Sequence, residues 1–190
     1  MLPPAQQPLQ AQAIKDASEA GGYGIEDERI MAKKQEVKTN AMRILEGMKI
    51  EYTTQSYECK EFEDGGQVAD ALGLSHEKVY KTLVCQGNSK GYYAFVIPID
   101  SELDLKKAAR SVDEKNVEMI HVKDIRNVTG YVRGGCTSIG MKKNYPVRID
   151  ESARQLTDMY VSAGKIGCQI NLKPEDLKMA AEAQWADITR

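Results

Sequence analysis

The pattern that most constrains the fold lies in residues 79–98. Residues 79–85 (VYKTLVC) and 92–98 (YYAFVIP) are two mostly apolar runs, and the turn sequence GNSKG at 87–91 separates them. Two such runs joined by a short glycine-containing turn are typical of an antiparallel β-hairpin. The sheet of this protein is therefore expected to be built around this hairpin, with Lys81 near the start of its first strand.

Apolar spacing along the rest of the chain predicts short helices and strands. Helices are expected at 40–48, 67–72, 105–112, 122–128 and 174–184. Further strands are expected at 50–57, 117–120, 147–150, 159–162 and 168–172, the last two as a second hairpin. Because strands and short helices are interspersed, the expected fold class is α+β, with a mixed, largely antiparallel sheet or small barrel surrounded by short helices.

The first 30 residues differ from the rest of the chain. They are rich in Ala, Gln, Pro and Gly and show no sustained apolar period. Such a composition does not bury enough apolar surface to offset the entropy of ordering the chain. We therefore expect a flexible N-terminal extension at 1–37 and one folded domain at 38–190.

Composition excludes several classes of protein. A net charge of −2 argues against a protein that coats nucleic acid by bulk charge. The four cysteines (Cys59, Cys85, Cys136 and Cys168) are scattered without C-x-x-C spacing, and only two histidines are present, so neither a zinc site nor a disulfide framework is expected. No signal peptide pattern and no apolar run of roughly 20 residues occur. We expect a cytoplasmic protein without cofactor, metal or membrane.

A glycine-rich segment is the strongest sign of a binding site. Residues 134–140 (GGCTSIG) combine three glycines with the hydroxyls of Thr137 and Ser138. Glycines let backbone N–H groups approach a ligand and form an anion-binding concavity, although a tight connection between strands explains the same residues. Gly164 and Gly167 flank a second turn of the same kind. Nucleophile elbow, P-loop, dinucleotide fingerprint and zinc-protease motifs do not occur in the sequence.

Lys81 also has two interpretations. A lysine near a strand end can hold its ammonium in water while its stem covers apolar surface. It can instead point into a cleft and receive an anion. Together with the two glycine turns, the residues themselves indicate a ligand that is phosphorylated or carries an activated acyl group.

Five motifs, in order and spacing, resemble the YbaK/EbsC family. They are V-Y-K-T-L-V, L-D-L-K-K-A-A, K-x-V-E-M, T-G-Y-V-x-G-G-x-x-x-x-G-x-K-K and Y-V-S-A-G-K-x-G, and the resemblance covers about residues 38–190. These proteins are free-standing aminoacyl-tRNA deacylases related to the editing domain of bacterial prolyl-tRNA synthetases. The resemblance implies trans-editing of mischarged tRNA, most typically Cys-tRNA(Pro), with tRNA as the partner and prolyl-tRNA synthetase as a possible second one.

The resemblance also implies roles for single residues. Lys81 matches the functional lysine, which holds the phosphate or ribose of the tRNA 3′ end, and Thr82 adjoins it. Gly134 and Gly135 match a glycine pair whose backbone faces the aminoacyl group. The remaining matched positions are Tyr57, which lines the substrate pocket, and Ser162 and Gly164 in the second turn. Phe62 is a further candidate for the pocket lining.

Two positions depart from the family pattern. Thr137-Ser138 stands where the family often has Ser-Pro, and Gln169 stands where it commonly has an acidic residue. Both positions are expected to lie near the substrate, so a preference for Ala or another small amino acid over Cys stays open. The sequence is also compatible with a non-catalytic member that binds tRNA or a synthetase, and with a cell-envelope regulator.

The implied mechanism does not require a nucleophile from the protein. In the cysteine-specific members the thiol of the substrate is thought to attack the ester carbonyl, and the amino acid leaves as a cyclic thiolactone. The protein then supplies positioning and stabilisation of the oxyanion. Each of the four cysteines is accordingly expected to be replaceable without loss of turnover.

Overall fold

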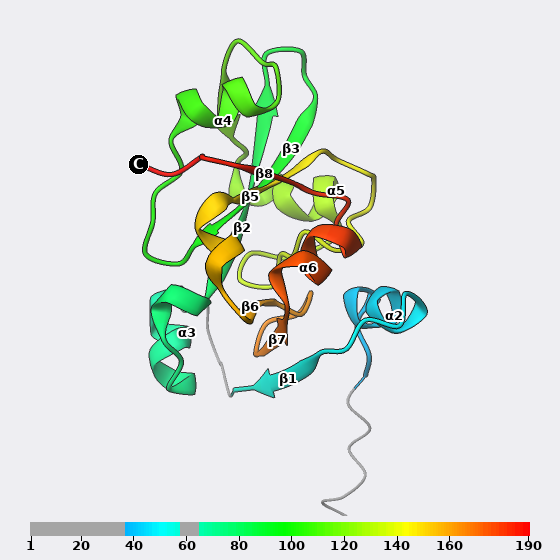
Figure 1. Cartoon of the computed structure of the whole chain (residues 1–190). Coiled ribbons are helices and arrows are strands. Elements are labelled where there is room, and N and C mark those ends of the chain that lie inside the picture. The colour runs from blue at the N-terminus through cyan, green and yellow to red at the C-terminus, as the bar shows by residue number, and fades with distance from the viewer. Residues whose placement is uncertain (1–36, 58–64) are drawn as a thin grey trace, which may run out of the picture. The chain divides into compact units, whose positions relative to one another are not determined.

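The hairpin expected at 79–98 is confirmed and lies at the centre of the larger sheet. The structure, a computed structural model, describes residues 37–57 and 65–190. Strands β2 (Tyr80–Gly87) and β3 (Tyr92–Pro98) pair antiparallel, as Figure 1 shows. Apart from Val37, the predicted extension lies outside the described residues, as does Phe62.

Three further strands complete this sheet, in the order β4-β2-β3-β5-β8. The strand β4 (Val117–Met119) pairs antiparallel with the far edge of β2. Strands β5 (Val147–Asp150) and β8 (Gln184–Ala186) continue the sheet in parallel beyond β3. The sheet is therefore mixed.

A second, antiparallel sheet has three strands in the order β1-β7-β6. It consists of β1 (Thr53–Ser56), β7 (Cys168–Leu172) and β6 (Met159–Ser162), and the last two form the second predicted hairpin. A single parallel bridge between Val79 and Tyr160 links it to the start of β2. The α+β class with mostly antiparallel pairing is thus confirmed.

Short helices surround both sheets (Figure 1). The α-helices are α2 (Asn40–Gly47), α3 (Gly65–Leu72), α4 (Leu105–Ser111), α5 (Ile125–Thr129) and α6 (Pro174–Ala180). The 3-10 turns are η1 (His76–Lys78), η2 (Val122–Asp124) and η3 (Glu151–Gln155). Among the described residues, no helix is long and apolar enough to cross a membrane.

Local sequence signals fix several of these helix ends. The Thr39 hydroxyl accepts a hydrogen bond from the Met42 N–H, and the Asp104 carboxylate accepts two from the first turn of α4. Gly130 ends α5 with φ of 84°, a left-handed conformation that glycine adopts without a steric penalty.

The prediction of a helix through Gln184 was wrong. The helix α6 ends at Ala180, and Glu182 adopts φ of 49°, which turns the chain out of the helical path. Gln184 and Trp185 then form β8 and pair with β5. Pairing satisfies the backbone groups on the edge of β5, and this tertiary gain outweighs the helical spacing of the segment.

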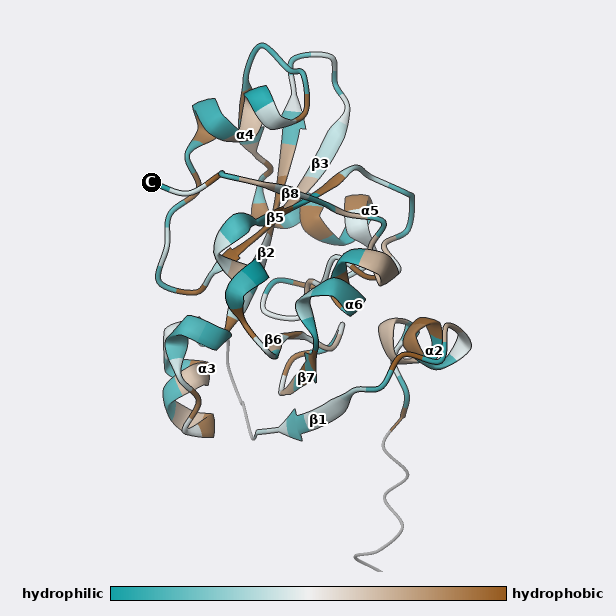
Figure 2. Cartoon of the chain, viewed as in Figure 1, coloured by the Kyte–Doolittle hydropathy of each residue, from teal (hydrophilic) through white to brown (hydrophobic). Residues whose placement is uncertain are grey.

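Two of three apolar clusters among the described residues hold the layers of the larger sheet together. The larger lies between the two sheets and includes Val96, Ile149 and Ile170, each fully buried. The smaller lies beneath α4, where Phe95 and Ala108 are fully buried. In Figure 2 the centre of the five-stranded sheet is brown, whereas α4 and α6 carry hydrophilic surfaces.

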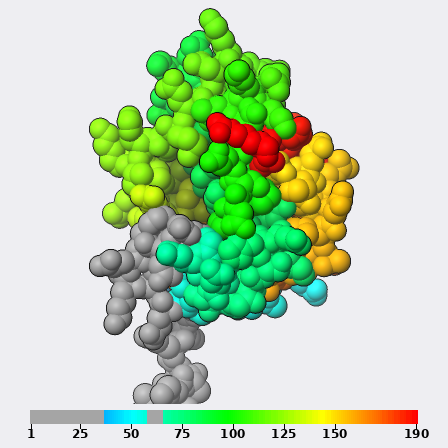
Figure 3. Space-filling model, turned by 90° about the vertical axis from the view of Figure 1, so that its left-hand side faces the viewer, coloured from blue at the N-terminus to red at the C-terminus, as the bar shows by residue number. Residues whose placement is uncertain are grey.

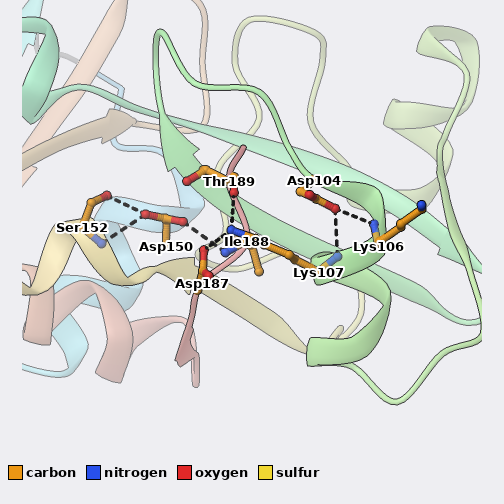
Figure 4. A network of polar contacts seen from close by, with 8 residues as sticks. All are labelled: Asp104, Lys106, Lys107, Asp150, Ser152, Asp187, Ile188 and Thr189. Carbon is orange, nitrogen blue, oxygen red and sulfur yellow. Dashed lines mark hydrogen bonds and ion pairs between the residues drawn. The ribbon is translucent and has the colours of Figure 1, made fainter.

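A buried carboxylate fixes the C-terminal segment to the sheet (Figure 4). Asp150 is 4% exposed, and its Oδ2 accepts a hydrogen bond from the Ile188 N–H at 3.2 Å. Its Oδ1 accepts hydrogen bonds from the N–H and the hydroxyl of Ser152 at 3.1 and 2.6 Å. The charge is therefore compensated by three donors, as burial requires.

Lys107 of α4 holds the same segment from the other side. Its Nζ lies 2.8 Å from Asp187 Oδ1 and donates to the Thr189 carbonyl at 2.8 Å (Figure 4). The segment also forms a bridge between Thr189 and Leu103. These contacts fix the position of Arg190, which lines a cavity beside β2.

Candidate active site

A cavity of about 830 Å³ lies along one open edge of β2. The strand β4 pairs only with Cys85–Gly87, so among the described residues no strand covers the edge of β2 from Tyr80 to Val84. The walls come from β2, α3, the segments after β3 and β4, the first glycine loop, and the ends of β1, β6 and β7. Segments far apart in the sequence therefore meet around one strand.

The backbone of β2 turns polar groups toward this cavity. The Ile99 N–H donates to the Val79 carbonyl on one side, and the Ile120 N–H donates to the Val84 carbonyl on the other. Backbone groups of an antiparallel strand alternate between its two neighbours. Those of Thr82 consequently point toward the open edge, and Thr82 lines the cavity.

Lys81 lines the cavity and is half-buried. It lies opposite Ile97 in the hairpin, and its Nζ donates to the Ile99 carbonyl at 2.6 Å. Because of that bond, the side chain lies across the end of the strand and does not extend into solvent. An ammonium fixed at a cavity wall suits an anionic or strongly polar ligand.

The two glycine turns pack against each other. A Cβ on Gly135 would lie 3.1 Å from Ile166 N and from the Lys165 carbonyl carbon, so this glycine permits close backbone contact. Gly134 has φ of 79° and lines the cavity. Gly164 has φ of 90°, and a Cβ there would lie 2.9 Å from the Tyr131 ring. The tight packing expected of such a loop is therefore present at Gly135, whereas anion binding at Gly134 stays a prediction.

Thr137 and Ser138 lie in the interior, 0% and 4% exposed. Within the described part of the chain neither hydroxyl has a hydrogen-bond partner. Neither residue lines the cavity, although Cys136 beside them does. The structure therefore places these two predicted substrate-binding residues behind the wall and not at its surface. Gly135 is also buried, and Gly164 is partly exposed but does not line the cavity.

A polar row crosses the second sheet at the cavity. Gln169 of β7 lies opposite Ser162 of β6 and opposite Gln55 of β1. Directly opposite residues share one face of an antiparallel sheet. Gln169 and Ser162 both line the cavity, and Gln169 is 7% exposed with its Oε1 unpartnered within the described ranges.

Tyr57 lines the cavity just beyond the end of β1. Its N–H donates to the Gly167 carbonyl at 2.9 Å, and a Cβ on Gly167 would lie 2.9 Å from the Tyr57 carbonyl oxygen. The second glycine turn thereby positions the tyrosine. Six of the ten predicted site residues line one cavity: Tyr57, Lys81, Thr82, Gly134, Ser162 and Gln169.

The thiols of this region are not activated as nucleophiles. Burial raises the pKa of Cys136 to about 11 and that of Cys85 to about 12. Both thiols are therefore protonated near neutral pH, whereas the thiolate is the reactive form. In the described ranges no cluster of three or more His, Cys, Asp or Glu side chains is placed to hold a metal ion.

Sequence reasoning missed several residues of the cavity. Arg133 precedes the glycine pair, and Arg190 reaches the cavity from the C-terminal segment, where it pairs with Glu102 at 2.8 Å. An apolar part of the cavity lining was also missed: Leu83, Leu103, Leu105 and Met119 lie within the quoted motifs, but apolar residues in such patterns predict packing in the core. The position of Arg133 within the first glycine motif was an available signal, whereas Arg190 is brought in by tertiary contacts.

Comparisons with known proteins identify the family. Residues 60–180 match the family described as the aminoacyl-tRNA editing domain. A protein of Enterococcus faecalis (strain ATCC 700802 / V583), provisionally named Cys-tRNA(Pro)/Cys-tRNA(Cys) deacylase EbsC, is 46% identical over 83% of this chain and 96% of its own length. The uncharacterized protein YwhH of Bacillus subtilis (strain 168) is 23% identical over 65% of this chain and 79% of its own length.

Solved structures share the fold. The hypothetical protein APE2540 matches with a TM-score of 0.71 at 22% identity and covers 78% of this chain and 97% of its own. A protein provisionally described as a trans-editing enzyme for prolyl tRNA synthetase matches with a TM-score of 0.68 at 22% identity, over 80% of this chain and 98% of its own. At this identity the likeness supports the fold alone.

The chain therefore belongs to the aminoacyl-tRNA editing domain family. It is an aminoacyl-tRNA deacylase of the YbaK/EbsC type, as the five motifs predicted.

Proposed function

We propose that this deacylase removes cysteine from mischarged tRNA(Pro) in the cytoplasm. The observation that carries the proposal is the cavity that gathers Lys81, Gly134 and the polar row of β6 and β7 around one open strand edge. The E. faecalis relative, whose name gives Cys-tRNA(Pro) as a substrate, supports the same choice.

The need for such an enzyme follows from the sizes of the amino acids. Cysteine and proline are similar in volume, and an apolar pocket discriminates between such side chains by only about 1–3 kcal/mol. A synthetase for proline therefore forms some cysteinyl-tRNA, and a second hydrolytic site corrects the error.

The proposed reaction uses the nucleophile of the substrate. The cysteinyl sulfur attacks the ester carbonyl carbon, so that a C–S bond forms and the C–O bond to the terminal ribose breaks. The thiol proton ends on the ribose oxygen, and the products are a cyclic thiolactone and uncharged tRNA. This route agrees with the protonated thiol of Cys136, which lines the cavity and whose pKa burial raises to about 11.

In this mechanism the protein orients the ester and stabilises charge. Lys81 holds the phosphate or ribose of the 3′ end as a cation on the cavity wall. Backbone groups at Gly134 and at the open edge of β2 face the aminoacyl ester, where N–H donors stabilise the oxyanion. Tyr57, Ser162 and Gln169 surround the amino-acid side chain.

Gln169 supports a second candidate substrate. A neutral amide lies here at the cavity, where the family commonly has an acidic residue, and this change alters how the amino group is held. A deacylase for alanyl-tRNA would fit the same position. Because alanine has no thiol, that reaction requires water as the nucleophile.

Selection of the tRNA is proposed to depend on a partner. Prolyl-tRNA synthetase, which forms the mischarged product, is the partner that the family implies. Direct transfer from synthetase to deacylase would supply the tRNA selectivity.

The test is a comparison of tRNAs that carry the proline anticodon. Cys-, Ala- and Pro-tRNA are incubated with the wild type and with Lys81→Ala, and loss of the ester is measured. Fast loss of the cysteinyl ester alone, with at least a tenfold decrease in Lys81→Ala, is expected. Loss of alanyl but not cysteinyl ester would retain the deacylase and reject the thiol route.

A further inference from the structure

One part of the cavity is lined by apolar side chains that have no part in the proposed chemistry of the ester. The wall consists of residues from β2, the start of α4, β4 and the turn that follows it: Leu83, Leu103, Leu105, Met119, Ile120 and Val122. Among them Leu105, Met119 and Val122 are 39%, 47% and 55% exposed. We call these six residues the apolar wall. Figure 3 shows the face on which the C-terminal segment, in red, lies beside the green residues near α4.

The cavity is larger than an aminoacyl group requires. A cysteinyl group has roughly seven non-hydrogen atoms. If each atom takes the volume of one water molecule in the liquid, about 30 Å³, the group fills on the order of 200 Å³. The cavity holds about 830 Å³. The remaining space is of the size that a nucleoside fills, within the range of ordinary small-molecule pockets.

The apolar wall begins beside Lys81 and continues along the sheet. Lys81, Leu83 and Cys85 alternate along β2 and so share one face of the strand. Met119 lies opposite Cys85, and the two sulfur atoms are 3.5 Å apart, which places Met119 on that same face. From Lys81 to Cys85 the strand advances about 13 Å, the length of a nucleoside with its phosphate.

We propose that the apolar wall binds the base of the terminal nucleotide of the tRNA substrate. This inference rests on the proposed function, because it takes Lys81 as the contact to the ribose or phosphate of that nucleotide. With the ester among the glycine loops and the sugar at Lys81, the base lies against Leu83, Leu105 and Met119. A base presents two flat, weakly polar faces, so an apolar surface binds it through burial and dispersion and not through a pattern of hydrogen bonds.

The chemistry of the wall favours a nucleobase over a peptide or a second protein. Lys81 at one end and Arg133 in the same cavity provide cations that suit a phosphate backbone. The wall is also continuous with the cavity that receives the ester, so a base attached to that ester reaches it without a second binding event. Contact with a base here fixes the ester more strongly than the small aminoacyl group does alone.

The test measures binding of an RNA hairpin that copies the acceptor stem, either with its complete CCA end or ending in CC. Fluorescence anisotropy gives the affinity of each hairpin for the wild type and for Met119→Ser. The wild type is expected to lose about five- to tenfold in affinity when the terminal nucleotide is removed. The affinity of Met119→Ser is expected to change less than twofold between the two hairpins.

Met179→Ser is the matched control. Met179 lies on α6, is 57% exposed and does not line the cavity, so this variant is expected to discriminate between the hairpins as the wild type does. Equal affinity of the wild type for both hairpins, including no measurable binding of either, would overturn the inference. Discrimination retained in Met119→Ser would overturn it as well.

A kinetic measurement separates this inference from the proposed function. Val122→Asn is expected to raise KM for cysteinyl-tRNA at least fivefold while kcat changes less than twofold, and cleavage of cysteine ethyl ester, which has no nucleoside, is expected to be unchanged. A wild type that cleaves no cysteinyl ester contradicts the proposed function, whereas the hairpin affinities test the apolar wall independently. Equal losses on both substrates would contradict the inference and indicate a structural effect.

Discussion

The carboxylate of Asp158 provides a quantitative test of how the two sheets are joined. Its Oδ1 lies 2.7 Å from Lys78 Nζ and accepts from the Thr157 hydroxyl at 2.8 Å, and its Oδ2 accepts from the Asn171 side chain at 2.8 Å. Lys78 precedes β2, whereas Asp158 precedes β6. The ion pair thus reinforces the adjacent bridge from Val79 across the two sheets.

The expected magnitude follows from the pKa of this group. The hydrogen bond with Lys78, and then those from Asn171 and Thr157, lower the pKa of Asp158 from 3.8 to about 2. A shift of this size corresponds to at most about 2.5 kcal/mol of stability. Because the two side chains are 31% and 39% exposed, solvent screening reduces the expected value to about 1 kcal/mol.

The sign of the pH dependence is fixed by the direction of the shift. A carboxyl whose pKa is lower in the folded state stabilises the protein above its unfolded pKa, and this contribution disappears as pH falls through the folded pKa. For Asp158 the contribution is therefore complete above about pH 4 and is lost toward about pH 2.

Urea unfolding, followed by the fluorescence of the single tryptophan, Trp185, measures this contribution. Asp158→Asn is expected to be about 1 kcal/mol less stable than the wild type at pH 7, with the difference falling below about 0.5 kcal/mol near pH 2.5. Asp187→Asn, which changes an exposed ion pair with Lys107, is the control. A difference for Asp158→Asn that is the same at both pH values would refute the reasoning, because packing and not charge would then be its origin.

Three further changes test the site and its frame. Gly135→Ala places a Cβ 3.1 Å from the backbone of Lys165 and Ile166, so the rate of deacylation is expected to fall at least tenfold. Gly47→Ala is the control because no atom lies within 4 Å of the added Cβ, and equal activity of the two variants would refute the close packing. Asp150→Ala removes the acceptor of the buried Ile188 N–H and of the partly buried Ser152 N–H, and is expected to cost about 1–3 kcal/mol in urea unfolding. Asp187→Ala is expected to cost less than about 0.5 kcal/mol, and similar losses in the two variants would contradict this role. Hydrogen bonds to Asp70 and Asp100 raise the pKa of His76, so the stabilising effect of the protonated imidazole is complete below about pH 6.5 and is lost as pH rises through the raised pKa. The difference in unfolding free energy between wild type and His76→Asn should shrink between about pH 5.5 and 8.5, and a difference that grows would contradict this role of His76.

Local patterns were sufficient for the parts of the fold that depend on near neighbours in the sequence. The β2–β3 hairpin, the caps at Thr39 and Asp104 and the left-handed Gly130 were all predictable, because each depends on a few consecutive residues. The strand β8 was not, since its pairing with β5 joins segments more than 30 residues apart and overrides the helical spacing near Gln184.

In the candidate site, too, some features follow from consecutive residues and others depend on tertiary structure. Family motifs selected Lys81, Gly134 and Ser162, which line the cavity. The hydroxyls of Thr137 and Ser138 were selected because they lie in the same glycine-rich segment, but both residues are buried and do not line the cavity. Sequence spacing cannot separate these cases, because residues on one glycine loop face either the cavity or the interior. A similar limit applies to Leu105 of the apolar wall, where helical spacing predicts a core position that the exposure of the residue contradicts.

Leu105 illustrates that limit. It shares helical spacing with Ala108 and Ala109, which are buried beneath α4, and the pattern alone therefore predicts a core residue. In the structure Leu105 is 39% exposed and lines the cavity, because it lies in the first turn of α4 at the edge of the packed surface.

The central claim is that the substrate brings the nucleophile and that the protein positions it. The most direct measurement compares the rates at which the wild type removes cysteine and S-methylcysteine from tRNA(Pro), together with analysis of the released product. The account predicts rapid loss of the cysteinyl ester with a thiolactone as the first product, and a rate at least a hundredfold lower for the S-methyl ester. Equal rates for the two esters, with free amino acid as the first product, would contradict it.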